Sequence, residues 1–468
     1  MILSPKYYLA YGACSLLLCN TLYADKALNS QLSNISQYKP LQLHKKLHYT
    51  KGEYATGVPF SSEYDKEWIE KFNIVQVGGV NDADISPQVL KDKGVLKSMY
   101  HIGYDWMPAF YHYTSGTNRP FIVDIIKHKE SMTLNPNGPF IHCKRNGYDW
   151  CEDYYYNYFD TTIFDMRVNE LVKAVNIKGY NGVFFDWGST KFLSEPENKQ
   201  MYEFVTAHYP KQSYLEQVKK FYTTLQERGV FVVSNQAFRD DALLASVDYD
   251  MTESYITTIK KLKKSIIVAD KNLTTVDLTR YYPIYANSHT IDDSLSFLNL
   301  LDSYKKKYKK NGFKNFIYMN YIAPKYIQVS ANIYKAVKPK NAIYYGYAMG
   351  KLTASIVYGE VQKNRNLEKD DIYFYDLGKP LGKSYQKLDA LHGYIRFFEK
   401  GFVLVSSAYQ SQKYIKIVSQ YLENIKSIFD TYNKQWLKNT KEGVTIRLDF
   451  EKNGFEEETL PLGRVFLY

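Results

Sequence analysis

Two acidic residues stand where apolar segments of the sequence end. The run Gly182–Phe185 is wholly apolar and stops at Asp186, and the segment 247–253 ends at Glu253. Two carboxyl groups can cleave a glycosidic bond, because one acid protonates the leaving oxygen while the other carboxylate attacks carbon or activates water. Asp186 and Glu253 are therefore the candidate catalytic residues.

Amide, acidic and aromatic side chains at the ends of the other apolar segments complete the candidate site. Asparagine can hydrogen-bond sugar hydroxyls, and tryptophan and tyrosine rings can stack on the apolar faces of sugar rings. An aspartate at a strand end can instead bind loop amides in a purely structural role, and both interpretations stay open for Asp250. The predicted substrate-binding residues are Tyr104, Asp105, Trp106, Trp187, Asn235, Tyr255, Asn287 and Asn320.

The neighbours of Glu253 favour it as the general acid. Apolar Met251 and Tyr255 lie close by in sequence, and a less polar setting raises the pKa of a carboxyl group. Asp186 would then be the nucleophile or the base, depending on the separation of the two carboxylates. The nine histidines are dispersed, with no Cys-x-x-Cys or His-Glu-x-x-His motif, so we expect neither a metal nor a cofactor.

Short apolar runs alternate with helical patterns over about 250 residues, which predicts parallel strands buried on both faces. This rhythm favours a (β/α)8 TIM barrel. A doubly wound open sheet is the alternative, although no glycine-rich phosphate-binding motif follows the first run. The predicted strands are 73–78, 98–103, 139–142, 182–186, 230–235, 247–253, 281–287 and 315–320.

Amphipathic helices are expected between these runs. Apolar residues recur at helical spacing from Val168 to Val175 and from Leu215 to Leu225. Gly179 and Gly229 stand where helix C-caps are expected.

The C-terminal part of the chain has a different pattern. After a predicted helix over 342–358, β-type segments over 372–375, 402–405, 444–450 and 464–468 indicate a small C-terminal β-rich domain. Heptad-like spacing from Tyr414 to Tyr432, with lysines interspersed, predicts an amphipathic helix. That helix would either pack on its own domain or bind a partner or a membrane surface. The expected organisation is a lead-in over 25–71, the barrel over 72–360 and the β-domain over 361–468.

The first 24 residues have the features of a signal peptide. Lys6 supplies a positive charge, 9–22 is mainly apolar, and Ala24 is a small residue at the cleavage position. A buried N-terminal helix is the alternative. Export predicts a periplasmic or secreted protein, and no other segment is long and apolar enough to span a membrane.

Cysteine usage fits that compartment. Cys14 and Cys19 would leave with the signal peptide, and Cys143 and Cys151 would remain on either side of a turn-rich segment. We expect them to form a loop-closing disulfide, with two free thiols as the alternative.

The net charge of +11 raises the question of nucleic-acid binding. The lysines are scattered, and no nucleic-acid-binding motif accompanies them, so solvated helix faces explain them better. The 46 tyrosines and 25 phenylalanines would suit a sugar-binding surface, but a compositional bias toward Tyr, Lys, Asn and Ile explains them as well.

Several segments resemble known glycosidases. Residues 181–186, Asn-Gly-Val-Phe-Phe-Asp, are similar to a conserved strand of glycoside hydrolase family 114 and of the family-15-like bacterial glycosidases. Residues 248–255 resemble their strand that ends in a functional glutamate. In the tail, 376–382 and 394–405 resemble the "D-L-G-x-P" and "R-x-F-x-x-G-x-V-L-V" segments of the family-15-like group.

The resemblance implies a (β/α)8 barrel with Asp186 and Glu253 as its functional acidic pair. It also implies activity like that of family members that cleave galactosaminoglycan internally. The sequence thus predicts an exported, endo-acting glycoside hydrolase whose partner is an envelope or extracellular polysaccharide. A catalytically silent glycan-binding or envelope-scaffold protein on the same barrel is the alternative.

Overall fold

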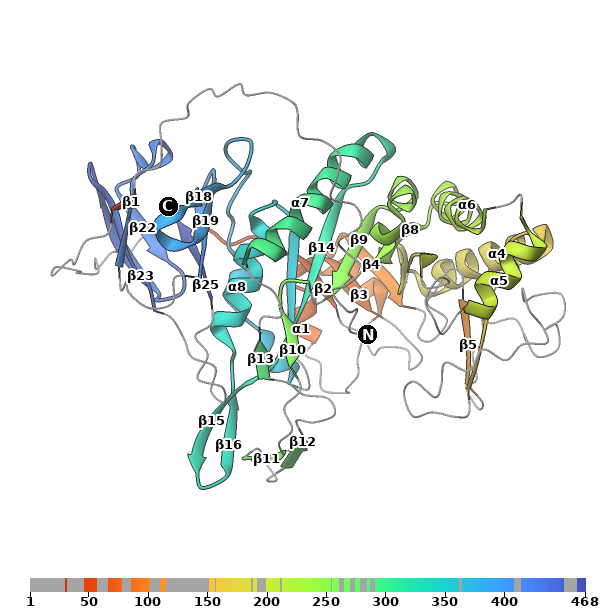
Figure 1. Ribbon diagram of the computed structural model, residues 1–468, viewed down its shortest axis with the longest axis horizontal. Helices are drawn as coiled ribbons and strands as arrows, with labels where there is room; N and C mark the ends of the chain where they lie inside the picture. The colour runs from red at the N-terminus through yellow and green to blue at the C-terminus, as the bar shows by residue number, and fades with distance from the viewer. Residues whose placement is uncertain are drawn as a thin grey trace.

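The computed structural model of the 468-residue chain shows a barrel followed by a β-domain (Figure 1). The structure describes residues 30–31, 46–56, 66–77, 86–101, 110–114, 151–155, 157–186, 188–191, 199–210, 213–253, 255–260, 265–269, 274–277, 284–286, 291–361, 364–407, 414–449 and 461–468.

An eight-stranded parallel sheet forms the barrel. Its strand order is β17-β14-β9-β8-β7-β4-β3-β2, the order of the chain read backwards. The two end strands approach each other, since the rings of Tyr54 and Tyr358 lie 6.1 Å apart. The predicted (β/α)8 fold is thereby confirmed. The strands are β2 (Gly52–Thr56), β3 (Phe72–Val77), β4 (Lys97–His101), β7 (Gly182–Phe185), β8 (Phe231–Asn235), β9 (Tyr249–Glu253), β14 (Asn315–Ile322) and β17 (Ile356–Val361).

Side chains bridge the seam between β2 and β17, which share no backbone ladder in the described part of the chain. Glu368, in the short helix η8 (Arg365–Glu368), accepts hydrogen bonds from the Tyr358 hydroxyl at 2.7 Å and the Val361 amide at 3.1 Å. Arg365 donates to the carbonyl of Thr56 on β2 at 2.5 Å and lies 3.6 Å from Glu368. The segment after β17 therefore closes the barrel.

Local signals account for the helices outside the barrel. Helix α4 (Thr161–Lys178) begins at Asp160, whose carboxylate accepts the amide hydrogens of Thr162 and Ile163, and ends at Gly179 with φ 78°. Gly229, just beyond helix α6 (Tyr214–Glu227), has φ +80°. Both predicted glycine caps are confirmed. The remaining barrel helices are α1 (Lys66–Ile69), α2 (Pro87–Asp92), α5 (Lys199–His208), α7 (Ile291–Tyr308) and α8 (Lys340–Lys351).

The predicted assignment of runs to barrel strands is right for the middle strands of the barrel and wrong for its first and last strands. The fourth, fifth and sixth predicted runs are barrel strands β7, β8 and β9. The first barrel strand is β2, in the segment assigned to the lead-in, so the first two predicted runs are the second and third strands. Strand β2 reads Gly-Glu-Tyr-Ala-Thr, which is too short and mixed in polarity to stand out. The predicted run 139–142 lies outside the described residues.

The last two barrel strands also differ from the prediction. The described part of the run 281–287 is β13 (Ile284–Ala286), which pairs antiparallel with β10 (Thr258–Lys260) outside the barrel. The run 315–320 is therefore the seventh strand. The eighth strand is β17, whose first residues fall within the predicted helix over 342–358. Helix α8 ends at Lys351, and the β-branched residues Ile356 and Val357 begin the strand that follows.

Two small sheets lie outside the barrel sheet. A small sheet of order β12-β11-β16-β15 projects from it (Figure 1), and β5 pairs with β6 in a separate two-stranded antiparallel sheet. These strands are β5 (Phe110–Thr114), β6 (Cys151–Tyr155), β11 (Ser265–Val268), β12 (Thr274–Asp277), β15 (Lys325–Ser330) and β16 (Ile333–Val337).

The C-terminal β-rich domain is a nine-stranded sheet of order β1-β21-β24-β23-β22-β25-β20-β19-β18, at the blue end of the chain in Figure 1. Its paired strands are antiparallel. The strands are β1 (Ser30–Gln31), β18 (Gln386–Leu388), β19 (Gly393–Phe398), β20 (Gly401–Ser406), β21 (Tyr414–Ile417), β22 (Ser427–Asp430), β23 (Gln435–Thr440), β24 (Gly443–Arg447) and β25 (Leu462–Leu467).

Two predictions for this domain are wrong. The expected helix over 414–432 is strand β21, a short turn of helix at Gln420–Leu422, and strand β22. In β21 burial alternates along the strand, so the spacing read as a heptad arises from a period of two in short segments. The expected strand over 372–375 is mostly the short helix η9 (Asp371–Phe374), which begins where the Asp370 side chain accepts the amide hydrogen of Ile372.

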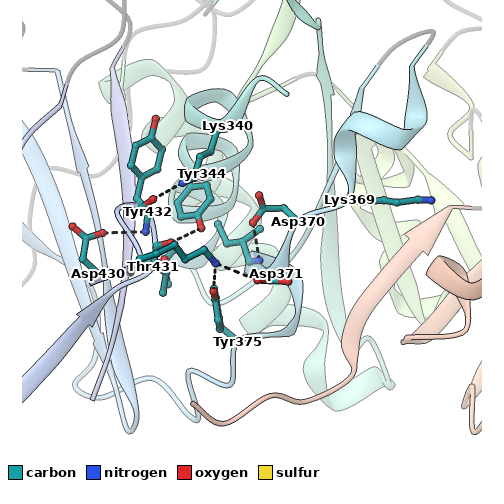
Figure 2. Close-up of polar contacts among 12 residues, drawn as sticks. Lys340, Tyr344, Lys369, Asp370, Asp371, Tyr375, Asp430, Thr431 and Tyr432 are labelled. Atoms are coloured by element: carbon teal, nitrogen blue, oxygen red, sulfur yellow. Dashed lines mark hydrogen bonds and ion pairs between the residues drawn. The ribbon is translucent and has the colours of Figure 1, made fainter. Parts of the chain in front are cut away.

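Helix α8 joins the barrel to the β-domain. The Tyr344 hydroxyl donates to the carbonyl of Thr431 at 3.0 Å, and the Lys340 ammonium group donates to the carbonyl of Tyr432 (Figure 2). A Cβ on Gly463 of β25 would lie 2.4 Å from the Cα of Tyr345, so only glycine permits this approach. The two parts of the chain therefore pack as one unit through α8.

Other predictions are not tested by the described residues. The signal segment 1–24 and Cys143 lie outside them, so the disulfide with Cys151 stays a prediction. No helix among the described residues is long and apolar enough to cross a membrane.

Candidate active site

The candidate carboxylates lie at the C-terminal ends of barrel strands separated by one strand. Asp186 directly follows β7, Glu253 ends β9, and Asn235 ends β8 between them. Asn235 pairs in register with Met251, two positions before Glu253. Because strand side chains alternate between faces, Asn235, Met251 and Glu253 share the barrel's inner face. The Sδ atom of Met251 lies 3.5 Å from the hydroxyl oxygen of Tyr54 on β2, a strand that is not adjacent to β9, which marks this face as the interior.

Asn235 bridges the two carboxylates. Its Nδ2 donates to Oδ1 of Asp186 at 2.5 Å and to Oε1 of Glu253 at 2.7 Å. These two oxygens therefore lie at most about 5 Å apart, which is closer than the roughly 6.5–9.5 Å between the carboxyl groups of inverting glycosidases. Asp186 and Glu253 are each partly exposed, whereas Asn235 is only 1% exposed. Asn235 thus holds the two carboxylates from beneath, and both carboxylates stay partly exposed at the surface.

The environment of Glu253 favours the protonated form of its carboxyl group. Burial, followed by the negative charge of Asp186 and then that of Glu360, raises the pKa of Glu253 to about 8, against the hydrogen bonds from Tyr321 and Asn235. A carboxyl group that is protonated at neutral pH can act as a general acid. This environment is in line with the role expected for Glu253 from its neighbours in sequence.

Two residues that the sequence prediction missed belong to the same cluster. The hydroxyl of Tyr321, near the end of β14, hydrogen-bonds to Glu253, and Glu360 lies near the end of β17. The sequence indicates Asn320 as the strand end, one position before Tyr321. It predicts a helix over 342–358, which hides the start of the strand that carries Glu360. The sequence signal that indicates Glu360 is an acidic residue at the fifth position of a short run that begins with β-branched residues.

Asn320 faces away from this cluster. It alternates with Tyr321 on β14, and its side chain contacts helix α8, where a Cβ on Gly346 would lie 2.8 Å from Nδ2 of Asn320. The residue is 1% exposed. Asn320 therefore packs between strand and helix instead of joining the predicted substrate-binding set.

Tyr255 lies in an aromatic cluster beside β9. Its ring stacks on Phe297 of α7 with centroids 4.1 Å apart, and it meets Phe238 edge-on at 5.6 Å. Tyr255 keeps partial exposure. One face of the ring is therefore covered by protein. The predicted residues Tyr104, Asp105, Trp106, Trp187 and Asn287 lie outside the described residues.

Asp250 has the structural role considered for strand-end aspartates. Its carboxylate accepts hydrogen bonds from the Ser234 hydroxyl at 2.8 Å and from the amides of Ala237 at 2.9 Å and Phe238 at 3.0 Å. It is fully buried on the strand face opposite Glu253. Asp250 thus anchors the loop after β8 and takes no part in the cluster.

In the described part of the chain no group of three or more His, Cys, Asp or Glu side chains is arranged to hold a metal ion.

No protein-family model matches the sequence, and no curated protein sequence is significantly similar to it. The resemblance to glycoside hydrolase family 114 therefore stays a hypothesis.

Solved structures with a similar arrangement of the chain include an amylase, a glucanotransferase and a galactosidase. A maltogenic alpha-amylase from Thermotoga neapolitana has a TM-score of 0.47 at 11% identity, covering 89% of this chain and 98% of the amylase. A cycloisomaltooligosaccharide glucanotransferase from Paenibacillus sp. has a TM-score of 0.44 at 9% identity, covering 89% and 85%. A GH36 alpha-galactosidase from Geobacillus stearothermophilus has a TM-score of 0.43 at 8% identity, covering 86% and 52%. At these levels the likeness carries no inference about activity or substrate.

Proposed function

We propose that the protein is a retaining glycoside hydrolase in which Asp186 and Glu253 carry out a double displacement. The observation that supports this most strongly is the bridge through Asn235, which holds both carboxylates on one nitrogen at the C-terminal end of a (β/α)8 barrel. Catalytic groups of such barrels lie at this end.

In the first step, Asp186 attacks the anomeric carbon as the bond from that carbon to the leaving oxygen breaks. Glu253 gives its proton to that oxygen. In the second step, the Glu253 carboxylate takes a proton from water, whose oxygen attacks the same carbon and releases Asp186. Each residue ends the cycle in the protonation state in which it began.

We further propose an exported, endo-acting enzyme on an envelope or extracellular polysaccharide. The signal-like segment 1–24 and the resemblance to internally cleaving glycosidases support this. If the segment is removed on export, the mature protein recovered from a periplasmic or culture fraction begins at Asp25. Mass spectrometry of its N-terminal peptide decides this, and an intact Met1 in that fraction would contradict it.

A panel of purified polysaccharides tests the proposed activity. Wild-type protein is expected to release new reducing ends from at least one of them, with products of mixed length if cleavage is internal. Asp186→Asn should abolish the release, because an amide cannot act as the nucleophile. Asp165→Asn on the exposed face of α4 makes the same chemical change away from the site and should leave activity intact. Binding without any cleavage would favour the catalytically silent protein.

A further inference from the structure

The strand register places Tyr321 between two carboxylates. On neighbouring strands Met319 pairs with Glu253, and Tyr321 pairs with Glu360. Tyr321 lies two positions beyond Met319 and therefore on the same face of β14. Glu253, Tyr321 and Glu360 thus form a row across three adjacent strands at the C-terminal end of the barrel.

The side-chain contacts agree with this register. Asn320 contacts helix α8, so Tyr321 faces the interior, where its hydroxyl hydrogen-bonds to Glu253. Glu360 is only 9% exposed, so its charge acts on its neighbours with little screening by water. Glu253 therefore has a hydrogen-bond donor on β14 and a second negative charge one strand further on.

We propose that Tyr321 and Glu360 are positioning residues that act on Glu253 in opposite directions, an inference that rests on the proposed acid/base role of Glu253. The Tyr321 hydroxyl holds and stabilises the ionised carboxylate. The Glu360 charge opposes ionisation and favours the protonated acid. Double displacement requires Glu253 to donate a proton and then accept one, and opposing influences keep both states accessible.

The charged and titratable groups around Glu253 are consistent with this division. Asp186 on the β7 side and Glu360 on β17 raise the pKa of Glu253, after the larger effect of burial, and the Tyr321 hydrogen bond lowers it. Burial also raises the pKa of Tyr321 well above its usual value, so its hydroxyl stays protonated and able to donate. On β2, burial and then the charges of Glu253 and Glu360 raise the pKa of Tyr54, whereas the Arg365 guanidinium lowers it; the Tyr54 hydroxyl donates to Gln76 at 2.5 Å.

The test is a direct titration of Glu253 in the full-length protein by carbon NMR with label in the glutamate side-chain carboxyl, assigned through Glu253→Gln. Tyr321→Phe should move the Glu253 midpoint up by about one pH unit, the size expected for a hydrogen bond to a charged group. Glu360→Gln should move it down by about one unit. Tyr318→Phe, on the opposite face of β14, and Glu227→Gln, exposed on α6, are the matched controls and should leave it unchanged.

The proposal would be overturned if Tyr321→Phe and Glu360→Gln shifted the titration midpoint of Glu253 in the same direction. It would also be overturned if both midpoints stayed within the range of the two control variants. If Glu360→Gln does not fold, Glu360→Met removes the same charge and decides the point. On any substrate that is cleaved, the alkaline limb of kcat/KM should move with each NMR midpoint, which a merely structural role would not cause. Because the titration needs no substrate, it can succeed even if the polysaccharide panel fails, and the two proposals are judged separately.

Discussion

Asp186 and Glu253 come from strands separated by one strand, and they share a single hydrogen-bond donor, Nδ2 of Asn235 on the strand between them. An amide donor placed between two carboxylates reduces their mutual repulsion without supplying a positive charge. It therefore allows a close pair in which one member stays protonated.

Replacing Asn235 tests this arrangement. Asn235→Ala removes both hydrogen bonds, so the carboxylates should lose their alignment, and kcat should fall about 10- to 100-fold. The matched control is Asn341→Ala, which removes another buried asparagine, one that donates to the carbonyl of Pro461 away from the site. Both variants should lower the thermal midpoint, but only Asn235→Ala should lower kcat. Equal kcat values in the two variants would contradict a role in the pair.

Glu253→Gln separates acid catalysis from binding. Glutamine keeps the shape of the side chain but cannot give a proton, so turnover of natural glycosides should fall by about 10²–10⁴-fold. Substrates with activated aryl leaving groups need no protonation and should lose much less in the first step. Steady-state kinetics on both substrate types measure the difference. Equal losses on the two types would argue against Glu253 as the acid.

The pH dependence of activity and of stability follows from the raised pKa of Glu253. Activity needs the protonated acid, so kcat/KM should fall as pH rises through about 8. Between about 4.5, the ordinary value, and about 8, the folded protein holds a proton that the unfolded chain has lost. The free energy of unfolding should therefore decrease as pH rises through this window.

The control for this pH effect is Glu253→Gln, which cannot titrate. Its free energy of unfolding, from urea titrations at several pH values, should show a smaller decrease over the same window. A wild-type stability that rises between pH 5 and 8 in step with that of Glu253→Gln would mean that Glu253 titrates normally.

Glu368 should contribute to stability through the barrel seam. Glu368→Ala removes the acceptor of Tyr358 and Val361 and the carboxyl group beside the partly buried Arg365, at a cost of about 2–4 kcal/mol in the free energy of unfolding. Glu227→Ala, on the exposed face of α6, should change it by about 0.5 kcal/mol or less. Chemical denaturation measures both, and similar values would show that the seam closes without Glu368.

Short apolar runs, clearest in β7 and β8, made the centre of the barrel predictable from the sequence. Strands β7, β8 and β9 are buried along most of their length, so Asp186, Asn235 and Glu253 could be placed at their ends. Strand β2 lacks such a run. Strand β17 follows α8 after only four residues, which hid the strand inside a helical pattern.

Which side chains at the strand ends point into the barrel could not be predicted with the same accuracy. Asn320 and Tyr321 are adjacent, and a shift of one position decides which of them faces the interior. The bridging role of Asn235 and the placement of Glu360 depend on which strands are neighbours, which only the closed barrel reveals.

The configuration of the first-formed product tests the central claim most directly. In the proposed mechanism, carboxylate oxygens at most about 5 Å apart leave no room for a water molecule between Asp186 and the sugar, so the proposal predicts a covalent glycosyl-enzyme intermediate. Proton NMR in the first minutes of hydrolysis, before the sugar mutarotates, should show the anomeric configuration of the substrate. A first product of inverted configuration would contradict the proposed roles of Asp186 and Glu253.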